Sequence, residues 1–219
     1  MKLSRVRLAR MKHAMGALMV TMMTGWAALA ADAPSSAEII GVTLQGSGCS
    51  QVTASATISP DLKDLSVLFD NMSVATDQAK VNQRTLTQEL GCEALIDIAV
   101  PAGWSFAFTG ADYRGFASPA SGTQVYQKLL FSAPGMPIVS MRDARFNAPY
   151  NGEYFFQALQ KPGRYAYSSC GSGVVRISLN AIVGIYFQNR GQYPQSMITL
   201  DSQDMSLAQT AHMEWRRCY

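Results

Sequence analysis

Histidine is scarce in this sequence, and its scarcity limits the chemistry that the chain can support. The 219 residues include two histidines, His13 and His212. A histidine-based zinc site, a Ser-His-Asp triad or a Cys-His pair would have to use one of them. The sequence also has no nucleophile-elbow, phosphate-loop or dinucleotide-binding motif. It therefore predicts no catalytic residue, no metal site and no cofactor, with His212 on a strand at the surface or rim.

Charge is sparse as well, and it is unevenly placed. Lys and Arg total 18 and Asp and Glu total 15, but five of the basic residues lie within residues 1–31. Residues 32–219 therefore hold 13 basic and 15 acidic side chains, a net charge of −2. Nucleic-acid binding depends on concentrated Lys and Arg. We therefore predict no nucleic-acid partner.

The N-terminal segment has the composition of a secretory signal peptide. Basic residues up to Lys12 precede an uncharged run over residues 14–30, and Ala28 and Ala30 give a small-x-small cleavage signal. The run is shorter than the ~20 residues that span a bilayer. We expect residues 1–31 to be cleaved, with no permanent membrane anchor. Residues 32–219 are then one soluble domain, secreted or periplasmic.

The cysteines also indicate export. All four, Cys49, Cys92, Cys170 and Cys218, lie beyond residue 31, and none belongs to a C-x-x-C motif. Structural zinc sites usually take their ligands in close pairs, so a metal site is disfavoured. An even number of cysteines in an exported chain indicates two disulfides, for which three pairings are possible.

Alternation of apolar and polar residues dominates the rest of the chain. Such a period of two is typical of half-buried β-strands, and turn sequences such as "SPDLKD", "APGMP" and "KPGR" separate the runs. About ten short strands without a long helical pattern predict an all-β fold, an antiparallel β-sandwich. One or two helical turns are expected within residues 75–88. The candidate strands are 39–44, 52–58, 65–69, 93–100, 104–108, 124–131, 138–146, 154–159, 174–187 and 211–216.

The stretch "DYRG" at residues 112–115 concentrates charge in a weakly charged chain. On a strand, Asp112 and Arg114 point to one face, while Tyr113 and Gly115 point to the other. A glycine within a strand usually marks a bulge or the close approach of another group.

Two interpretations of this stretch are open. In the first, Arg114 is mostly buried and forms a structural ion pair with Asp201 or Asp204, because its five donors can tie several strands together. In the second, Asp112, Tyr113 and Arg114 contact a ligand. The first interpretation is favoured.

An ordered set of landmarks resembles an uncharacterised family of secreted fungal and bacterial proteins, domain of unknown function 4360. The resemblance covers nearly all of the chain beyond residue 31, and it implies an exported single domain with four cysteines and no established reaction. Basic and amide residues are common before the second cysteine in that family, where this chain has Glu89, Leu90 and Gly91. The landmarks are "GSGCS" at 47–51, "LSVLFDNMSV" at 65–74, "LGCEALIDIAVPAGWSFAF" at 90–108, "DYRGFA" at 112–117, "SSCGSG" at 168–173, "LDSQD" at 200–204 and "WRRC" at 215–218. We predict the sequential disulfides Cys49–Cys92 and Cys170–Cys218.

These features favour a non-enzymatic extracytoplasmic binding or surface-interaction module. Its partner would be carbohydrate or an extracytoplasmic protein, met by flat aromatic side chains. The alternative is a carboxylate-dependent hydrolase acting on cell-wall or environmental polysaccharide, which needs two facing acids ~5 to 9.5 Å apart. The aromatic candidates are Trp104, Tyr113, Tyr150, Tyr165 and Tyr193.

Overall fold

The structure is a computed structural model that describes residues 33–49, 54–69, 72–171, 173–200 and 209–218. These residues belong to one compact unit, Ala31–Tyr219. The predicted signal peptide, residues 1–31, lies outside the described ranges. Within those ranges, no helix has both the length and the apolar character needed to cross a membrane.

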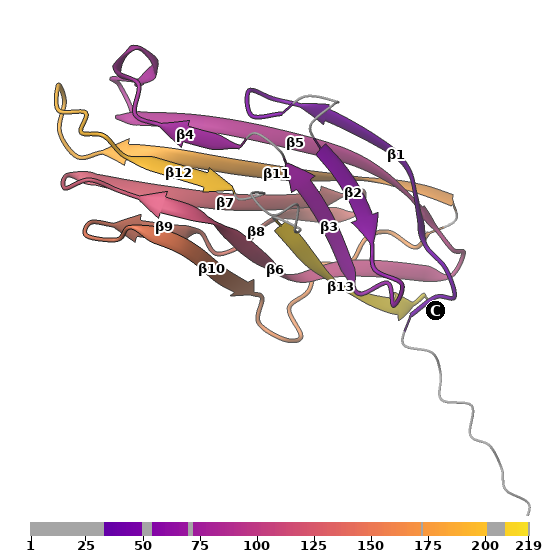
Figure 1. The fold of residues 1–219 in the computed structure, drawn as a ribbon. Helices are drawn as coiled ribbons and strands as arrows, with labels where there is room; N and C mark the ends of the chain where they lie inside the picture. Colours follow the sequence, from indigo (N-terminus) through magenta and orange to yellow (C-terminus); the bar gives the residue numbers. More distant parts are fainter. Residues whose placement is uncertain (1–32, 50–53, 70–71, 172, 201–208, 219) are drawn as a thin grey trace, which may run out of the picture. The chain divides into compact units, whose positions relative to one another are not determined.

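The described residues form two antiparallel sheets, as predicted for a β-sandwich (Figure 1). The first sheet contains, in spatial order, β1 (Glu38–Gln45), β5 (Thr87–Val100), β11 (Gly173–Phe187), β7 (Thr123–Ala133) and β8 (Met136–Ser140), and β9 (Ala144–Asn147) also pairs with β7. The second sheet contains β2 (Ala54–Ile58), β3 (Asp64–Phe69), β13 (Gln209–Arg217), β6 (Trp104–Ser118), β12 (Met197–Leu200) and β4 (Ser73–Ala75), and β10 (Gly152–Leu159) pairs with β6.

The described chain has thirteen strands where the sequence predicts about ten. The predicted strand 138–146 is divided into β8 and β9 by Met141–Asp143. The other two additions, β4 and β12, are three and four residues long, too short to show an alternating pattern. The expected helical turn is a 3₁₀ helix over Gln78–Lys80, which the Asp77 side chain caps by accepting from the Ala79 amide.

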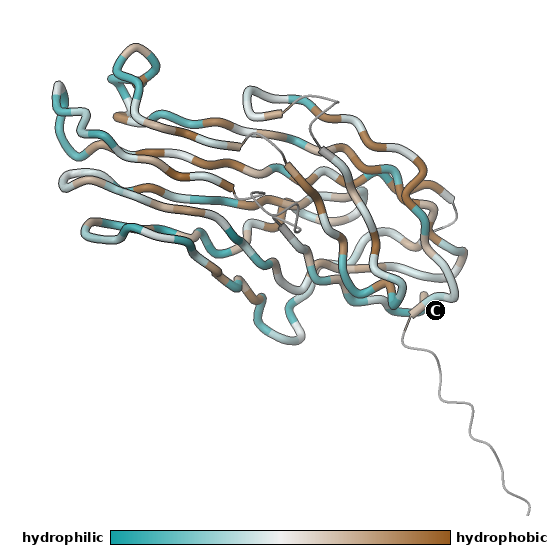
Figure 2. The backbone as a smooth tube through the Cα atoms, viewed as in Figure 1, coloured by the Kyte–Doolittle hydropathy of each residue, from teal (hydrophilic) through white to brown (hydrophobic). Residues whose placement is uncertain are grey.

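Alternation along the long strands builds the core between the sheets. In β5, Cys92, Ala94, Ile96 and Ile98 are fully buried, and the residues between them point outward. Figure 2 shows brown and pale segments alternating along these strands. Phe108 of β6 stacks on Phe131 of β7 with 4.4 Å between ring centroids. The aromatic pair therefore joins the two sheets through the core.

Strand β6 is the centre of the second sheet. Residues 104–113 pair with β13, and residues 115–118 pair with β12 further along the same edge. Residues 110–117 pair with β10 on the other edge. The "DYRG" stretch therefore lies where three strands meet β6.

Both predicted disulfides are confirmed. Cys49 is bonded to Cys92 with a Cα–Cα distance of 5.3 Å, and Cys170 to Cys218 with 6.0 Å. Cys92 is fully buried in β5, so the first disulfide fixes the segment after β1 to the core. The second joins the segment after β10 to the end of β13.

Candidate functional site

The outer face of the second sheet carries an aromatic and polar surface, here called the Arg114 face. It consists of Asp64, Asp112, Arg114, Phe155, Gln157, Leu159 and His212. Strand pairing assembles it: Phe155 lies opposite Arg114, Gln157 opposite Asp112 and Leu159 opposite Gly110. Because side chains stand nearly perpendicular to a sheet, these residues form a flat surface rather than a cleft.

Arg114 is exposed, so the prediction of a mostly buried guanidinium is wrong. The alternation in "DYRG" is as predicted, but no layer of the described protein covers the face to which Arg114 points. Its guanidinium carbon lies 5.1 Å from the centroid of the Phe155 ring. The proposed partners Asp201 and Asp204 lie outside the described residues, so that ion pair stays a prediction.

Of the three predicted ligand contacts, Asp112 and Arg114 reach the surface and Tyr113 does not. Tyr113 is fully buried, and its ring lies nearly parallel to that of Phe156, 5.8 Å away. The large side chain of Tyr113 thus supports Arg114 from the core side of β6.

Phe155 and Leu159 make the face partly apolar. The exposed fractions of Phe155 and Leu159 are 58% and 66%. Both residues lie on β10, which pairs with β6. Leu159 and His212 meet over Gly110, where an added Cβ would lie 2.8 Å from the Leu159 side chain and 3.2 Å from the imidazole. Phe155 and Leu159 thus add two exposed apolar side chains to the polar groups of this face.

His212 joins two carboxylates on this face. Its Nδ1 lies 2.7 Å from Asp64 Oδ1 and its Nε2 lies 3.2 Å from Asp112 Oδ1. Gln157 donates to the same Asp112 oxygen over 3.1 Å. A histidine that activates a nucleophile needs a hydroxyl or thiol at its second nitrogen. His212 is half-buried on β13, and its Nε2 faces the Asp112 carboxylate rather than a hydroxyl or thiol.

The pKa of His212 is raised. Partial burial alone would lower the pKa, but the contacts with Asp64 and then Asp112, together with their charges, outweigh it. A raised folded-state pKa stabilises the fold below the unfolded pKa of about 6.5, and this contribution is lost as pH rises through the folded pKa.

We predict a pH-dependent stability difference between the wild type and His212→Gln. The wild type should be more stable by up to about 1 kcal/mol below pH ~6.5, and the difference should shrink as pH rises further. Urea unfolding of both proteins at several pH values measures it. Because His212 is the one histidine beyond residue 31, a difference that does not change with pH would contradict the assigned contacts.

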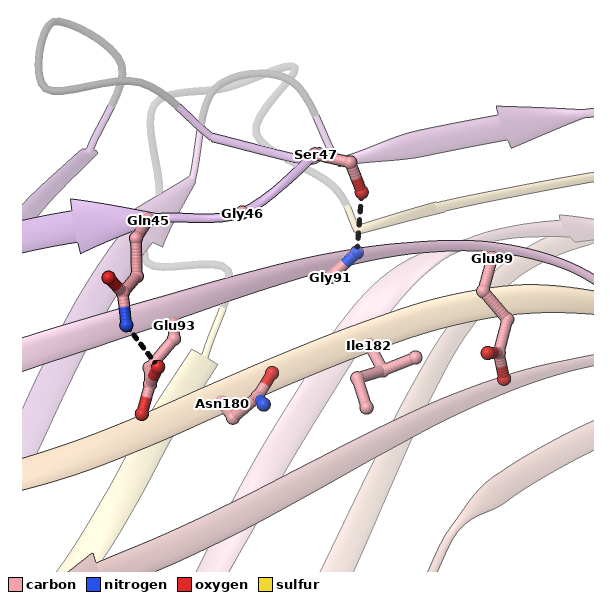
Figure 3. Close-up of a pocket in the computed structure, with 8 residues that line it drawn as sticks. All are labelled: Gln45, Gly46, Ser47, Glu89, Gly91, Glu93, Asn180 and Ile182. Atoms are coloured by element: carbon pink, nitrogen blue, oxygen red, sulfur yellow. Dashed lines mark hydrogen bonds between the residues drawn. The ribbon is translucent and has the colours of Figure 1, made fainter.

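A groove of about 550 Å³ lies on the first sheet, lined by Gln45, Gly46, Ser47, Glu89, Gly91, Glu93, Asn180 and Ile182 (Figure 3). Gly91 forms its floor between Glu89 and Glu93, which point the same way from β5. The Ser47 hydroxyl accepts a hydrogen bond from the Gly91 amide. Of the three residues before the second cysteine, Glu89 and Gly91 line this groove.

The two acids of the groove are not arranged as a hydrolase pair. Glu89 and Glu93 are four residues apart on one strand, so their Cα atoms are separated by ~13 Å. Ser178 and Gln45 donate to Glu93 and lower its pKa, Ser178 more strongly. Glu89 accepts from Tyr126 and lies 3.8 Å from Lys128 Nζ. Because glycoside hydrolysis needs an acid with a raised pKa, the lowered pKa of Glu93 does not favour Glu93 as that acid.

The sequence did not single out the exposed aromatic residue of the site, Phe155, and the aromatic residues that it did predict are buried or half-buried. Trp104 and Tyr113 are buried, and Tyr150, Tyr165 and Tyr193 are half-buried. Phe155 lies in the run Tyr154-Phe155-Phe156, where alternation requires it to oppose its two neighbours. This alternation predicts that Phe155 points away from its two neighbours, but it does not predict which face of the strand is covered.

Comparison with known proteins places the chain in a family. Residues 35–218 match the family described as Domain of unknown function (DUF4360). The chain belongs to this family. One relative is an uncharacterized secreted protein of Arthroderma benhamiae (strain ATCC MYA-4681 / CBS 112371). The two sequences are 28% identical over 185 residues, and the alignment covers 84% of this chain and 73% of that protein.

A solved structure also overlaps much of this DUF4360 chain. It is TmCBM61 in complex with β-1,4-galactotriose, at 10% identity and a TM-score of 0.28, covering 82% of this chain and 90% of that one.

Among the described residues of this chain, no group of three or more His, Cys, Asp and Glu side chains is arranged to hold a metal ion.

Proposed function

We propose that this DUF4360 protein is a non-enzymatic extracytoplasmic module that binds carbohydrate chains through the Arg114 face. Export is supported by the signal-type N-terminal sequence, the two disulfides and the secreted relative. We further propose that the protein leaves the cell rather than staying in a periplasm, because its relative is a secreted protein.

The observation that carries the proposal is the exposed Phe155 ring bordered by hydrogen-bonding groups. A sugar ring has an apolar C–H face and a polar rim, and an aromatic face flanked by polar groups complements both. Arg114 supplies donors next to Phe155. Asp112 and Gln157 supply an acceptor and an amide one step along the strands.

The shape of the face suits a chain rather than a small molecule. Strands β6 and β10 run antiparallel, and their outward side chains follow one another in a line from Phe155 through Gln157 to Leu159. Alternate residues of a strand repeat every ~7 Å along it. An extended ligand lying along β10 would therefore meet an aromatic, a polar and an apolar contact in turn.

The test combines a glycan array with an assay for released reducing sugars. We expect binding to at least one polysaccharide or oligosaccharide without release. Phe155→Ala should weaken that binding by about 10- to 100-fold, because truncation of an aromatic contact at the centre of a site costs about 1–3 kcal/mol. Arg114→Ala should weaken it in the same direction.

The matched control is Ile138→Ala. Ile138 is 73% exposed on β8 of the other sheet, so its removal should leave binding unchanged. All three variants should melt within a few degrees of the wild type, because surface substitutions usually change stability by less than about 0.5 kcal/mol. Silence of the whole array would contradict the carbohydrate ligand. Release of sugar would contradict a non-enzymatic role, and unchanged binding by Phe155→Ala would contradict the site.

A further inference from the structure

A second pocket, the Arg142 pocket, lies between the edge strands β9 and β10. Its volume is about 330 Å³, and it is lined by Arg142, Asp143, Arg145, Phe146 and Phe156. Figure 1 shows β9 and β10 next to each other where the two sheets meet. Phe156 and Phe155 are consecutive on β10 and point to opposite sides of it. The Arg142 pocket is therefore separate from the Arg114 face.

The pocket carries one uncompensated positive charge. Asp143 Oδ2 lies 2.6 Å from Arg145 Nη2, and Arg145 also donates to Gln124. Arg142 is exposed, and its guanidinium carbon lies 5.4 Å from the centroid of the Phe156 ring. Within the described ranges, no carboxylate pairs with Arg142. Two guanidinium groups and one carboxylate leave a net charge of +1, which one anionic group would neutralise.

The rest of the pocket is aromatic, and its rings pack against buried tyrosines. Phe156 is backed by the fully buried Tyr113 ring. Phe146 packs against Tyr154 with 4.6 Å between ring centroids. The Tyr113 hydroxyl is buried without a hydrogen-bond partner among the described residues. Burial and then the nearby Asp143 charge raise the pKa of Tyr113. A protonated donor therefore lies close to the pocket and has no acceptor in the described protein.

We infer that the Arg142 pocket binds a single ring that carries one carboxylate. The carboxylate pairs with Arg142, whose planar fork of donors matches carboxylate geometry, and the ring lies against Phe156 and Phe146. A volume of about 330 Å³ is at the lower end of small-molecule sites, which suits one ring. Sugar acids and aromatic acids share this chemistry. The inference does not depend on the function proposed for the Arg114 face.

Isothermal titration calorimetry with glucuronate, benzoate and the neutral methyl ester of glucuronate tests this inference. We expect glucuronate, benzoate or both to bind with a Kd of about 1 mM, and the ester to bind at least about tenfold more weakly. Tighter binding of glucuronate identifies the sugar acids as the ligand source, and tighter binding of benzoate identifies the aromatic acids.

Arg142→Gln should weaken binding by about 10- to 100-fold, the loss expected for a hydrogen-bonded charge. Arg142→Lys should restore part of it, because the charge returns without the planar fork. Arg84→Gln is the matched control, since Arg84 is also an exposed arginine but lies in the turn before β5, outside both the Arg142 pocket and the Arg114 face. It should bind like the wild type.

Three results would overturn the inference: no binding of either acid, equal binding of the ester, or equal weakening by Arg84→Gln and Arg142→Gln. The third would show that net charge rather than the pocket attracts the ligand. Because Arg142 is exposed, its variants should melt like the wild type. If Arg142→Gln melts lower, Phe156→Leu must still weaken binding, since it removes the ring and keeps an apolar side chain.

Discussion

Replacing Gly115 with alanine is expected to lower the free energy of unfolding by on the order of 3–5 kcal/mol. An added Cβ would lie 2.0 Å from the carbonyl oxygen of Thr199 and 2.6 Å from the Tyr154 hydroxyl. The first contact is with backbone, so β12 would have to move away from β6. The second would displace Tyr154, whose hydroxyl donates to Gln127 over 2.5 Å inside the core. Both shifts disrupt the strands that hold the Arg114 face.

Chemical denaturation of Gly115→Ala beside Gly152→Ala measures this effect. Gly152 begins β10 on the same sheet, and an added Cβ there would have no heavy atom within 4 Å. Gly152→Ala should therefore be neutral or slightly stabilising, because it restricts the unfolded chain. If Gly115→Ala were within about 1 kcal/mol of the wild type, a loss smaller than overpacking normally costs, the close approach of β12 to β6 would be wrong.

Removal of the Cys49–Cys92 disulfide is expected to cost about 4 kcal/mol or more, and removal of Cys170–Cys218 about 4 kcal/mol. The two bonds close loops of similar length, with sequence separations of 43 and 48 residues, so the chain-entropy contributions are nearly equal. A difference in stability between the two variants therefore reflects the packing of the cysteines. Cys92 is fully buried in β5, whereas Cys170 is exposed. Replacement of Cys92 therefore also removes core contacts.

The comparison uses the double variants Cys49→Ala/Cys92→Ala and Cys170→Ala/Cys218→Ala under non-reducing denaturation. Each variant keeps the other disulfide and has no free thiol, so disulfide exchange does not confuse the result. We expect the first variant to be the less stable. The reverse order, or a loss below about 1 kcal/mol in both, well under the usual cost of a native disulfide, would show that the disulfides do not support the fold in this way.

The strands were largely predictable because their alternation is local. The runs around Ile96 and Val183 carry their burial pattern in the sequence itself, and both are central strands. The two-residue period also gave the correct division of "DYRG" into two faces. It could not say that the face with Arg114 is uncovered, because that depends on what the fold places above the sheet.

The arrangement of the site depends on pairings between distant segments. His212 and Asp64 are 148 positions apart in the sequence and meet only because β13 pairs with β3. Phe155 becomes the partner of Arg114 only through the register of β10 on β6. No local pattern encodes such registers, so Asp112 and Arg114 were identifiable as candidates, whereas Phe155 and the assembly of the face were not.

A two-dimensional NMR titration of the isotopically labelled protein with a glycan selected on the array tests directly whether carbohydrate binds to the Arg114 face. We expect the largest amide shifts in residues 110–116 and 153–159, and anomeric signals of the glycan that stay unchanged over time. Shifts centred on residues 89–93 and 180–182, in the groove of the first sheet, would contradict the Arg114 face as the binding surface. New reducing-end signals would contradict the absence of catalysis.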